Sequence, residues 1–276
     1  MSGAPGEVRH SPSSTGSVVT ALGGVLREFN RTAEAVLQGL REQPLRPSGA
    51  DVAFSRLRGE EQLRELRAAM PRRVLNLTEG IQIAERQAAL LRWQIGHSAT
   101  PILPTEALIE LPFLMVTYRT AIGKSGLATK TEQGWVIVLR ADEPQVRQRF
   151  SLAHEIKHAL DDELLTRFPD GLYRTWGGRT AQELAERVCD HFAGCLLMPK
   201  MLLRRDWTNR MQDPSRLARR YHVSRAAMEV RLRQTGLIEP TERCGTPAAQ
   251  PLDFQARQSN DQDGLVTSAR TGARDE

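Results

Sequence analysis

Residues 150–160 read F-S-L-A-H-E-I-K-H-A-L and contain the pattern H-E-x-x-H. On an α-helix, residues four apart lie on the same face, so His154 and His158 can direct two imidazoles to one point. Neutral imidazole is a common zinc ligand. Glu155 lies at the edge of that face, where it can act as general base towards a zinc-activated water. The stretch therefore predicts a catalytic zinc site on a helix, the arrangement typical of metalloproteases.

Two solvated histidines on an amphipathic helix are the alternative explanation of this pattern. The flanking residues argue against it, because an apolar surrounding indicates a buried helix. The apolar residues are Phe150, Ala153, Ile156, Ala159 and Leu160. Buried imidazole and carboxylate groups side by side need partners, which favours a metal site over two solvated histidines.

A catalytic zinc ion usually has three protein ligands and one position for water, so a third ligand is expected. Glu186 is the leading candidate, because it lies in the middle of a predicted helix where an unpaired carboxylate would be costly. His191 is the rival ligand. Asp161 and Asp162 are more simply interpreted as solvated acids near a helix end.

Three further residues accompany Glu186 on the same predicted helix. Asp190 follows it by four residues and can orient a ligating histidine by accepting that histidine's second N–H. Cys189 and Cys195 are six residues apart and would not converge from one helix. We interpret both cysteines as small buried apolar residues.

Capping residues and apolar periodicity predict where the elements begin and end. Helices are expected over 17–43, from Asp51 to near Pro71, from Thr78 to about Gly96, and as a short turn capped by Thr105. Strands are expected over 113–118, 126–131 and 135–139. Asp142 should cap the H-E-x-x-H helix, which should run to about Leu165, and Thr180 should cap a helix that runs to Met198. Asp213-Pro214 and Ser224 should start two more helices, and Gly236 should end the second.

Composition argues against a disulfide-rich, membrane-spanning or secreted protein. The chain has 276 residues, 40% of them hydrophobic and 26% charged, which is ordinary for a soluble protein. Three cysteines make no disulfide framework. We expect no membrane span and no secretory signal, and hence a cytoplasmic protein. The formal net charge of +5 is only weak evidence for an acidic partner such as nucleic acid.

Two stretches resemble the ImmA/IrrE family of zinc metallo-endopeptidases. R-F-S-L-A-H-E-I-K-H at 149–158 is similar to the family's R-F-T-x-A-H-E-x-G-H. E-R-V-C-D-H-F-A at 186–193, followed by L-L-M-P at 196–199, is similar to its E-x-x-A-N-x-F-A…L-L-M-P. The resemblance covers about residues 75–238. Lys157, Cys189 and Asp190 depart from the family's usual Gly, Ala and Asn.

The resemblance implies a cytoplasmic protease that cleaves a helix-turn-helix transcriptional repressor, inducing a mobile element or a stress response. It implies one Zn²⁺ per chain, held by His154, His158 and Glu186, with Glu155 as general base. A further donor should stabilise the oxyanion of the transition state. Tyr173, His191 and Tyr221 are the candidates, and the sequence does not choose among them.

The expected fold class is α+β. It is mostly helical, with a small three-stranded sheet beside a zincin-like H-E-x-x-H helix and a helix-turn-helix-like segment after it. The expected parts are disordered residues 1–16, an N-terminal helical extension over 17–71, the peptidase core over 72–199, the helix-turn-helix-like segment over 200–240 and a disordered tail over 241–276.

Two other functions compete with proteolysis. A DNA-binding regulator with a structural zinc site would use residues 213–236 to enter the major groove. A structural site has no use for a base beside the ligands, so Glu155 favours catalysis. An inactive peptidase scaffold that only binds a partner is the weaker third possibility.

Overall fold

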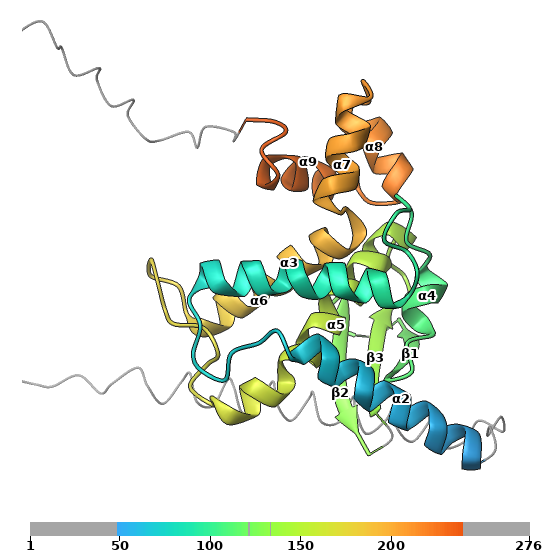
Figure 1. Cartoon of the computed structure of the whole chain (residues 1–276), viewed down its shortest axis with the longest axis vertical. Coiled ribbons are helices and arrows are strands. Elements are labelled where there is room, and N and C mark those ends of the chain that lie inside the picture. The colour runs from blue at the N-terminus through green and yellow to red at the C-terminus, as the bar shows by residue number, and fades with distance from the viewer. Residues whose placement is uncertain (1–48, 121, 133, 240–276) are drawn as a thin grey trace, which may run out of the picture. The chain divides into compact units, whose positions relative to one another are not determined.

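The computed structural model describes residues 49–120, 122–132 and 134–239, and the predictions for residues 1–16, 17–43 and 241–276 lie outside them. Within the described part, helices predominate over one three-stranded sheet, which confirms the predicted α+β class (Figure 1). The elements are α2 (Gly49–Arg67), α3 (Leu77–Gln94), α4 (Thr105–Ile109), β1 (Leu114–Arg119), β2 (Gly126–Thr131), β3 (Gly134–Arg140), α5 (Gln145–Arg167), α6 (Ala181–Leu197), α7 (Lys200–Thr208), α8 (Pro214–Tyr221) and α9 (Arg225–Gln234).

The three predicted strands form one mixed sheet in the order β1-β3-β2. β1 runs parallel to the central strand β3, and β2 runs antiparallel to it, with Gly126 opposite Leu139. Side chains alternate along β3, as a strand requires. Trp135, Ile137 and Leu139 join the main core, whereas Val136 and Val138 belong to a small cluster on the opposite face.

Helix α5 carries the H-E-x-x-H pattern and contacts the sheet through β2 and β3. Its start differs from the prediction, because Pro144 is the N-cap residue and no side chain caps the helix. Asp142 is instead paired with Arg140, whose Nε lies 2.8 Å from its Oδ1. The side-chain amide of Gln148 ties the preceding loop to the helix by donating to the carbonyls of Arg140, Ala141 and Glu143.

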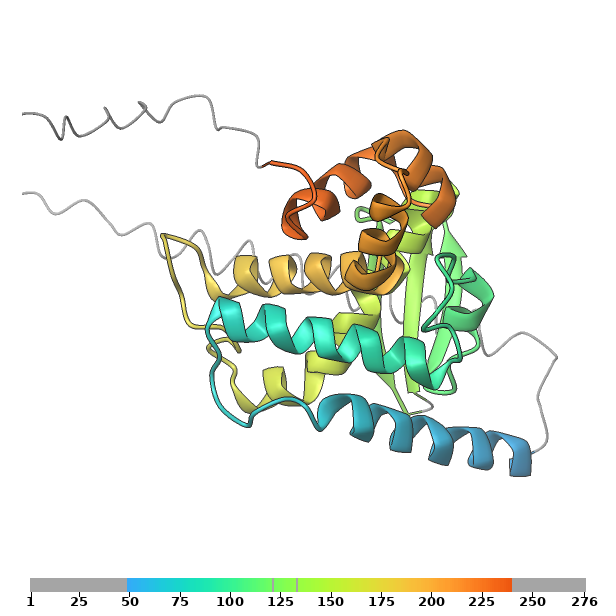
Figure 2. The ribbon, with the colours of Figure 1, turned by 45° about the horizontal axis from the view of Figure 1, so that its top comes forward.

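Helix α6 packs against both α5 and α3, and α3 and α6 lie side by side in Figures 1 and 2. The predicted capping box at Thr180 and Glu183 is confirmed. Helix α3 begins one residue before the predicted Thr78. Asn76 is its N-cap and forms a capping box with Glu79, which was not predicted. The predicted N-cap of α4 was also wrong, because Pro104 and not Thr105 holds that position.

Helices α8 and α9 pack against each other after α7. Asp213 and Ser224 cap them as predicted, and Gly236 follows α9 with φ +71°. The predicted apolar interior is also confirmed, since all five of its side chains are buried: Leu217, Ala218, Val223, Met228 and Leu232. This packing is a structural result, and a DNA-binding role for the segment remains a prediction.

Candidate metal centre

Three predicted ligands meet between α5 and α6. The Nε2 atoms of His154 and His158 are 3.1 Å apart, one helical turn separating the two rings on α5. Glu186 reaches them from α6, with Oε2 3.1 Å from His154 Nε2 and Oε1 3.6 Å from His158 Nε2. Gln182, one turn earlier on α6, donates to Glu186 Oε1 at 2.8 Å and so orients the carboxylate.

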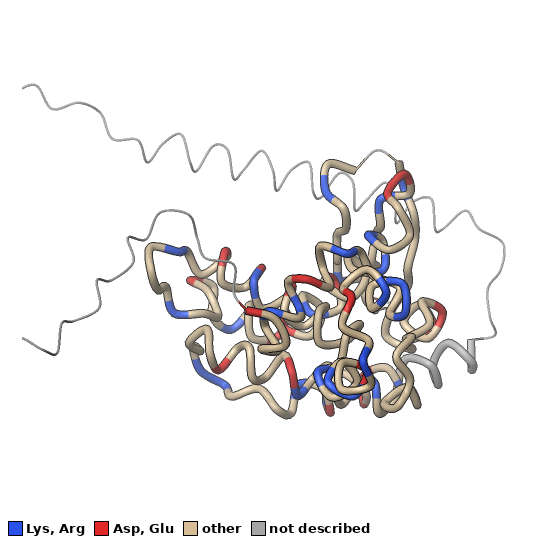
Figure 3. Tube along the Cα trace, turned by 90° about the horizontal axis from the view of Figure 1, so that it is seen from above, with Lys and Arg blue, Asp and Glu red and all other residues tan. Residues whose placement is uncertain are grey.

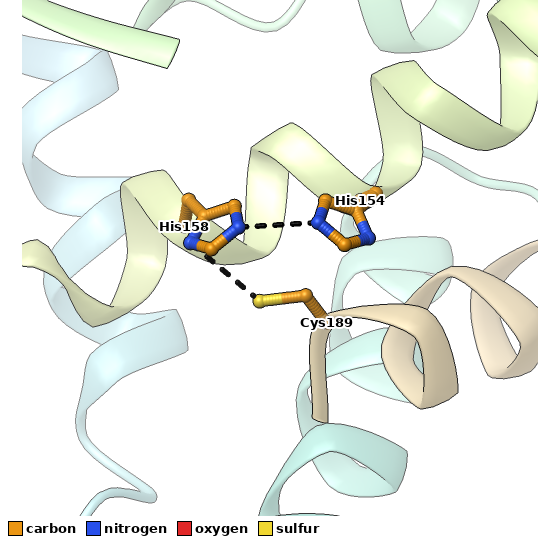
Figure 4. A group of neighbouring side chains, drawn as sticks. All are labelled: His154, His158 and Cys189. Atoms are coloured by element: carbon orange, nitrogen blue, oxygen red, sulfur yellow. Dashed lines mark hydrogen bonds between the residues drawn. The ribbon is translucent and has the colours of Figure 1, made fainter. Parts of the chain in front are cut away.

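Neighbouring residues of α6 contact the other nitrogen of each imidazole. Asp190 Oδ1 lies 2.9 Å from His154 Nδ1, the contact expected for a carboxylate that orients a ligating histidine. Cys189 Sγ lies 3.7 Å from His158 Nδ1 (Figure 4). The cysteine therefore contacts His158 on the side of the ring away from His154. This contact was not predicted, because Cys189 was interpreted only as a buried apolar residue.

Glu155 lies beside the cluster and is 9% exposed. Burial is the main reason that the pKa of its carboxyl is raised, and the two histidines partly oppose the rise. A raised pKa makes the carboxylate a stronger base nearer to neutral pH. The cleft that contains it has a volume of about 760 Å³ and is bounded by β2, α5, α6 and α9.

Hydrogen bonding sets the protonation of the cluster when no metal is bound. Burial alone would lower the pKa of His154, but hydrogen bonds to Asp190 and Glu186 outweigh it and raise the pKa to about 9. The same bonds, with His158, hold the pKa of Glu186 well below its usual range. The carboxylates of Glu186 and Asp190 thus favour a positive charge beside them, which is a proton on His154 when no metal is bound and would be a metal ion in its place.

The other candidate residues have different partners. His191 points to α3, where its Nε2 lies 3.2 Å from Glu85 Oε1. Tyr173 is 2% exposed and donates to Asp161, and Tyr221 is fully buried and donates to Asp206. None of these three side chains lines the described cleft. These placements do not favour His191 as a ligand or any of the three as an oxyanion donor.

Asp161 contradicts its interpretation as a solvated acid. It is 2% exposed and forms an ion pair with Lys157, whose side chain is fully buried. Tyr173 also donates to this carboxylate, at 3.3 Å. Residues four apart on a helix can pair in this way. Asp162 is partly exposed and pairs with Lys130 at 3.5 Å.

Comparison with known proteins matches this site to one family. Residues 119–233 match the IrrE N-terminal-like domain, and they include β2 to α8 and most of α9. This part of the chain is similar to the ImmA/IrrE family. The radiation response metalloprotease IrrE of Deinococcus deserti is 32% identical over 136 residues, which cover 47% of this chain and 44% of that protein. The protein of the same name from Deinococcus radiodurans is 32% identical over 124 residues, which cover 44% of this chain and 34% of that protein.

The chain spans less than half the length of these ImmA/IrrE relatives. A Mycobacterium tuberculosis transcriptional regulator of known structure aligns with 62% of this chain and 51% of its own, at a TM-score of 0.42 and 16% identity. No described helix has the length and apolar character needed to cross a bilayer.

Similarity to metalloproteases implies a resident metal ion, and the donor set fits one. Ligands about 2.0 Å from a tetrahedral centre lie about 3.3 Å from one another. The separations of 3.1, 3.1 and 3.6 Å among His154, His158 and Glu186 are close to that value. Two imidazoles and a carboxylate are also a known ligand set of catalytic zinc.

Proposed function

We propose that this protein is a zinc-dependent endopeptidase that cleaves a specific protein substrate. His154, His158 and Glu186 would hold one Zn²⁺, and Glu155 would be the general base. The observation that carries the proposal is that these four side chains line one cleft, with the three ligand side chains in contact. A zinc ion held there would polarise the scissile carbonyl and lower the pKa of water.

Glu155 would move the proton in this reaction. It would accept a proton from the attacking water as the oxygen bonds to the carbonyl carbon, and return it to the amide nitrogen as the C–N bond breaks. Asp190 would keep Nε2 of His154 directed at the ligand position. The side chains of His154 and His158 are partly buried, which would strengthen their interactions, because few water molecules would compete for the same groups.

The edge of the sheet supports an extended peptide as the substrate. β2 borders the cleft and, within the described residues, pairs only with β3. Its outer edge therefore offers backbone N–H and C=O groups to an incoming strand. Residues 124–128 line the cleft near Glu155, so a peptide paired there would pass the proposed base.

The proposed substrate is a helix-turn-helix transcriptional repressor, in the cytoplasm, as the family resemblance implies. Cleavage would relieve repression of a mobile element or a stress response. The test incubates the zinc-loaded full chain with the repressor encoded beside its gene and locates any cut by mass spectrometry. A single defined cut would support the proposal. An intact repressor, or cutting that survives removal of zinc by a chelator, would contradict it.

DNA binding is the second candidate function, and the charge of α7 to α9 favours it. Seven exposed arginines lie on these helices and the turns between them: Arg204, Arg205, Arg210, Arg216, Arg219, Arg220 and Arg225. Lys and Arg also occur on many other elements of the described chain (Figure 3), so this density is only supporting evidence. DNA binding through phosphates would weaken steeply with salt. Titration of the full chain with duplex DNA at two salt concentrations distinguishes this candidate.

A further inference from the structure

A second group of metal-binding side chains lies between α3 and α6, apart from the H-E-x-x-H cluster. His191 and Cys195 are four residues apart on α6, hence on one face of it. At 100° per residue, Cys195 lies on the opposite side of α6 from Glu186. Glu85 approaches from α3, with Oε1 3.2 Å from His191 Nε2. The ligand atoms of all three residues lie within 4.8 Å of one another.

Burial makes this group unlike a chance surface cluster. The side chain of His191 is 9% exposed, and Cys195 is 6% exposed. The side chain of Glu85 is 44% exposed, so the group is shielded on the helix side and open to solvent at the carboxylate. A cation could enter past Glu85 and reach an imidazole and a thiol that are already in place.

The donor set selects the class of metal. Thiolate and imidazole favour Zn²⁺ and related thiophilic ions, whereas Mg²⁺ and Ca²⁺ prefer sites made of oxygen. Ligands of a tetrahedral zinc lie about 3.3 to 3.6 Å apart, so a pair at 3.2 Å and a third atom within 4.8 Å need only a small side-chain adjustment.

We propose that Glu85, His191 and Cys195 form a second metal site, which binds Zn²⁺ or a similar thiophilic divalent ion and clamps α3 to α6. Three protein ligands would leave a fourth position for water on the exposed side. The thiol proton of Cys195 would pass to solvent on binding. The two anionic ligands would then balance the charge of the ion.

Arg231 sets the strength of this site. It contacts the Cys195 thiol from α9, and its Nε also donates to the carbonyl of Met198 at 3.1 Å. Burial raises the pKa of the Cys195 thiol to about 11, and Arg231 opposes that rise, which favours the thiolate that a metal needs. Its positive charge also repels a cation. The second site should therefore bind more weakly than the site on α5.

Cobalt is the probe that separates the two sites. Thiolate bonded to Co²⁺ gives a charge-transfer absorption in the near ultraviolet, and the proposed catalytic ligands contain no thiolate. The metal-free full chain would be titrated with Co²⁺ in a Cys244→Ser background, since Cys244 lies outside the described residues. We expect a second equivalent of Co²⁺ to bind more weakly than the first, and the absorption to appear as this second equivalent binds. Cys195→Ser should weaken that equivalent by about 100-fold or more and abolish the absorption.

Two matched variants complete the test. Cys189→Ser removes the cysteine beside His158, and His158→Ala removes a ligand of the site on α5. Both should retain the thiolate absorption. Each variant is compared with the parent by thermal unfolding without metal, so that misfolding is detected separately. Absorption that persists in Cys195→Ser, absorption lost in Cys189→Ser, or a single bound equivalent would overturn the proposal without affecting the proposed peptidase activity.

Discussion

The backbone of Gly126 lies so close to Glu155 that a Cβ added to the glycine would be 2.9 Å from Glu155 Cγ and 3.0 Å from its Oε1. Real Cβ atoms almost never approach other atoms so closely. The first residue of β2 thus fixes where the carboxylate of α5 can stand. The sheet is therefore part of the proposed catalytic machinery, as well as a support for the helix.

Gly126→Ala should displace the Glu155 carboxylate and leave the ligands in place. A shift of about 1 Å in a catalytic group can cost about 10²-fold in rate, so kcat should fall by about 10- to 100-fold. Metal content should be unchanged. Gly123→Ala is the matched control, because an added Cβ there meets no atom within 4 Å. Equal activity in the two variants would show that the contact does not position the base.

Glu155→Gln should separate chemistry from metal binding. The substitution preserves the size of the side chain and removes the base, so cleavage should fall by about 10²- to 10⁴-fold. Metal content and thermal unfolding should match those of the wild type. Full activity in this variant would mean that another group takes the proton from water.

The ligand assignment predicts which substitutions release the tightly bound metal. Purified protein should retain about one tightly held zinc per chain, as a site with three protein ligands implies. His158→Ala and Glu186→Ala should each lose it on dialysis. His97→Ala, a histidine whose side chain lies near Thr100 instead, should retain it. Elemental analysis measures the content, and equal metal in all four proteins would reject the assignment.

Local sequence signals were enough to predict most helices and strands. Features that depend on contacts between residues in the folded chain could not be predicted in this way. The spacing of His154 and His158 follows from helix geometry, so the sequence alone placed both imidazoles on one face. Capping boxes are equally local, which is why the start of α6 at Thr180 was predicted correctly. Asp142 has the residue type of a cap but is paired with Arg140, and only the structure shows that choice.

Contacts between separate elements could not be predicted from spacing. Nothing in the sequence near Gly126 indicates that Glu155, on another element, needs a neighbour without a side chain. His191 remained a rival to Glu186 because both lie on α6, and its pairing with Glu85 depends on how α3 packs. Lys157 and Asp161 did carry a local signal, four-residue spacing, which could have indicated their ion pair.

Zinc binding should release protons at neutral pH. The pKa of His154 is raised to about 9 in the absence of metal, so its ring is protonated at pH 7 and must lose a proton to bind zinc. Apparent affinity should therefore rise by about tenfold per pH unit between pH 7 and pH 9 from this group alone. Calorimetry in two buffers of different ionisation enthalpy measures the release. Asp190→Asn should reduce it, because the amide no longer stabilises the charged ring. Release that is unchanged in this variant would contradict the role of Asp190.

The buried ion pair of Lys157 and Asp161 should be costly to break and less costly to replace. Lys157→Met leaves the Asp161 carboxylate buried, with Tyr173 as its remaining hydrogen-bond donor among the described side chains, so the free energy of unfolding should fall by about 3–5 kcal/mol. Lys157→Met combined with Asp161→Leu removes both charges and should restore much of that loss, since an apolar pair avoids the desolvation cost. Denaturant unfolding of the metal-free proteins measures both. Suppose instead that the second substitution lowers the stability further, by as much as it does in the wild type. The two side chains would then not be coupled, and their ion pair would not stabilise the H-E-x-x-H helix.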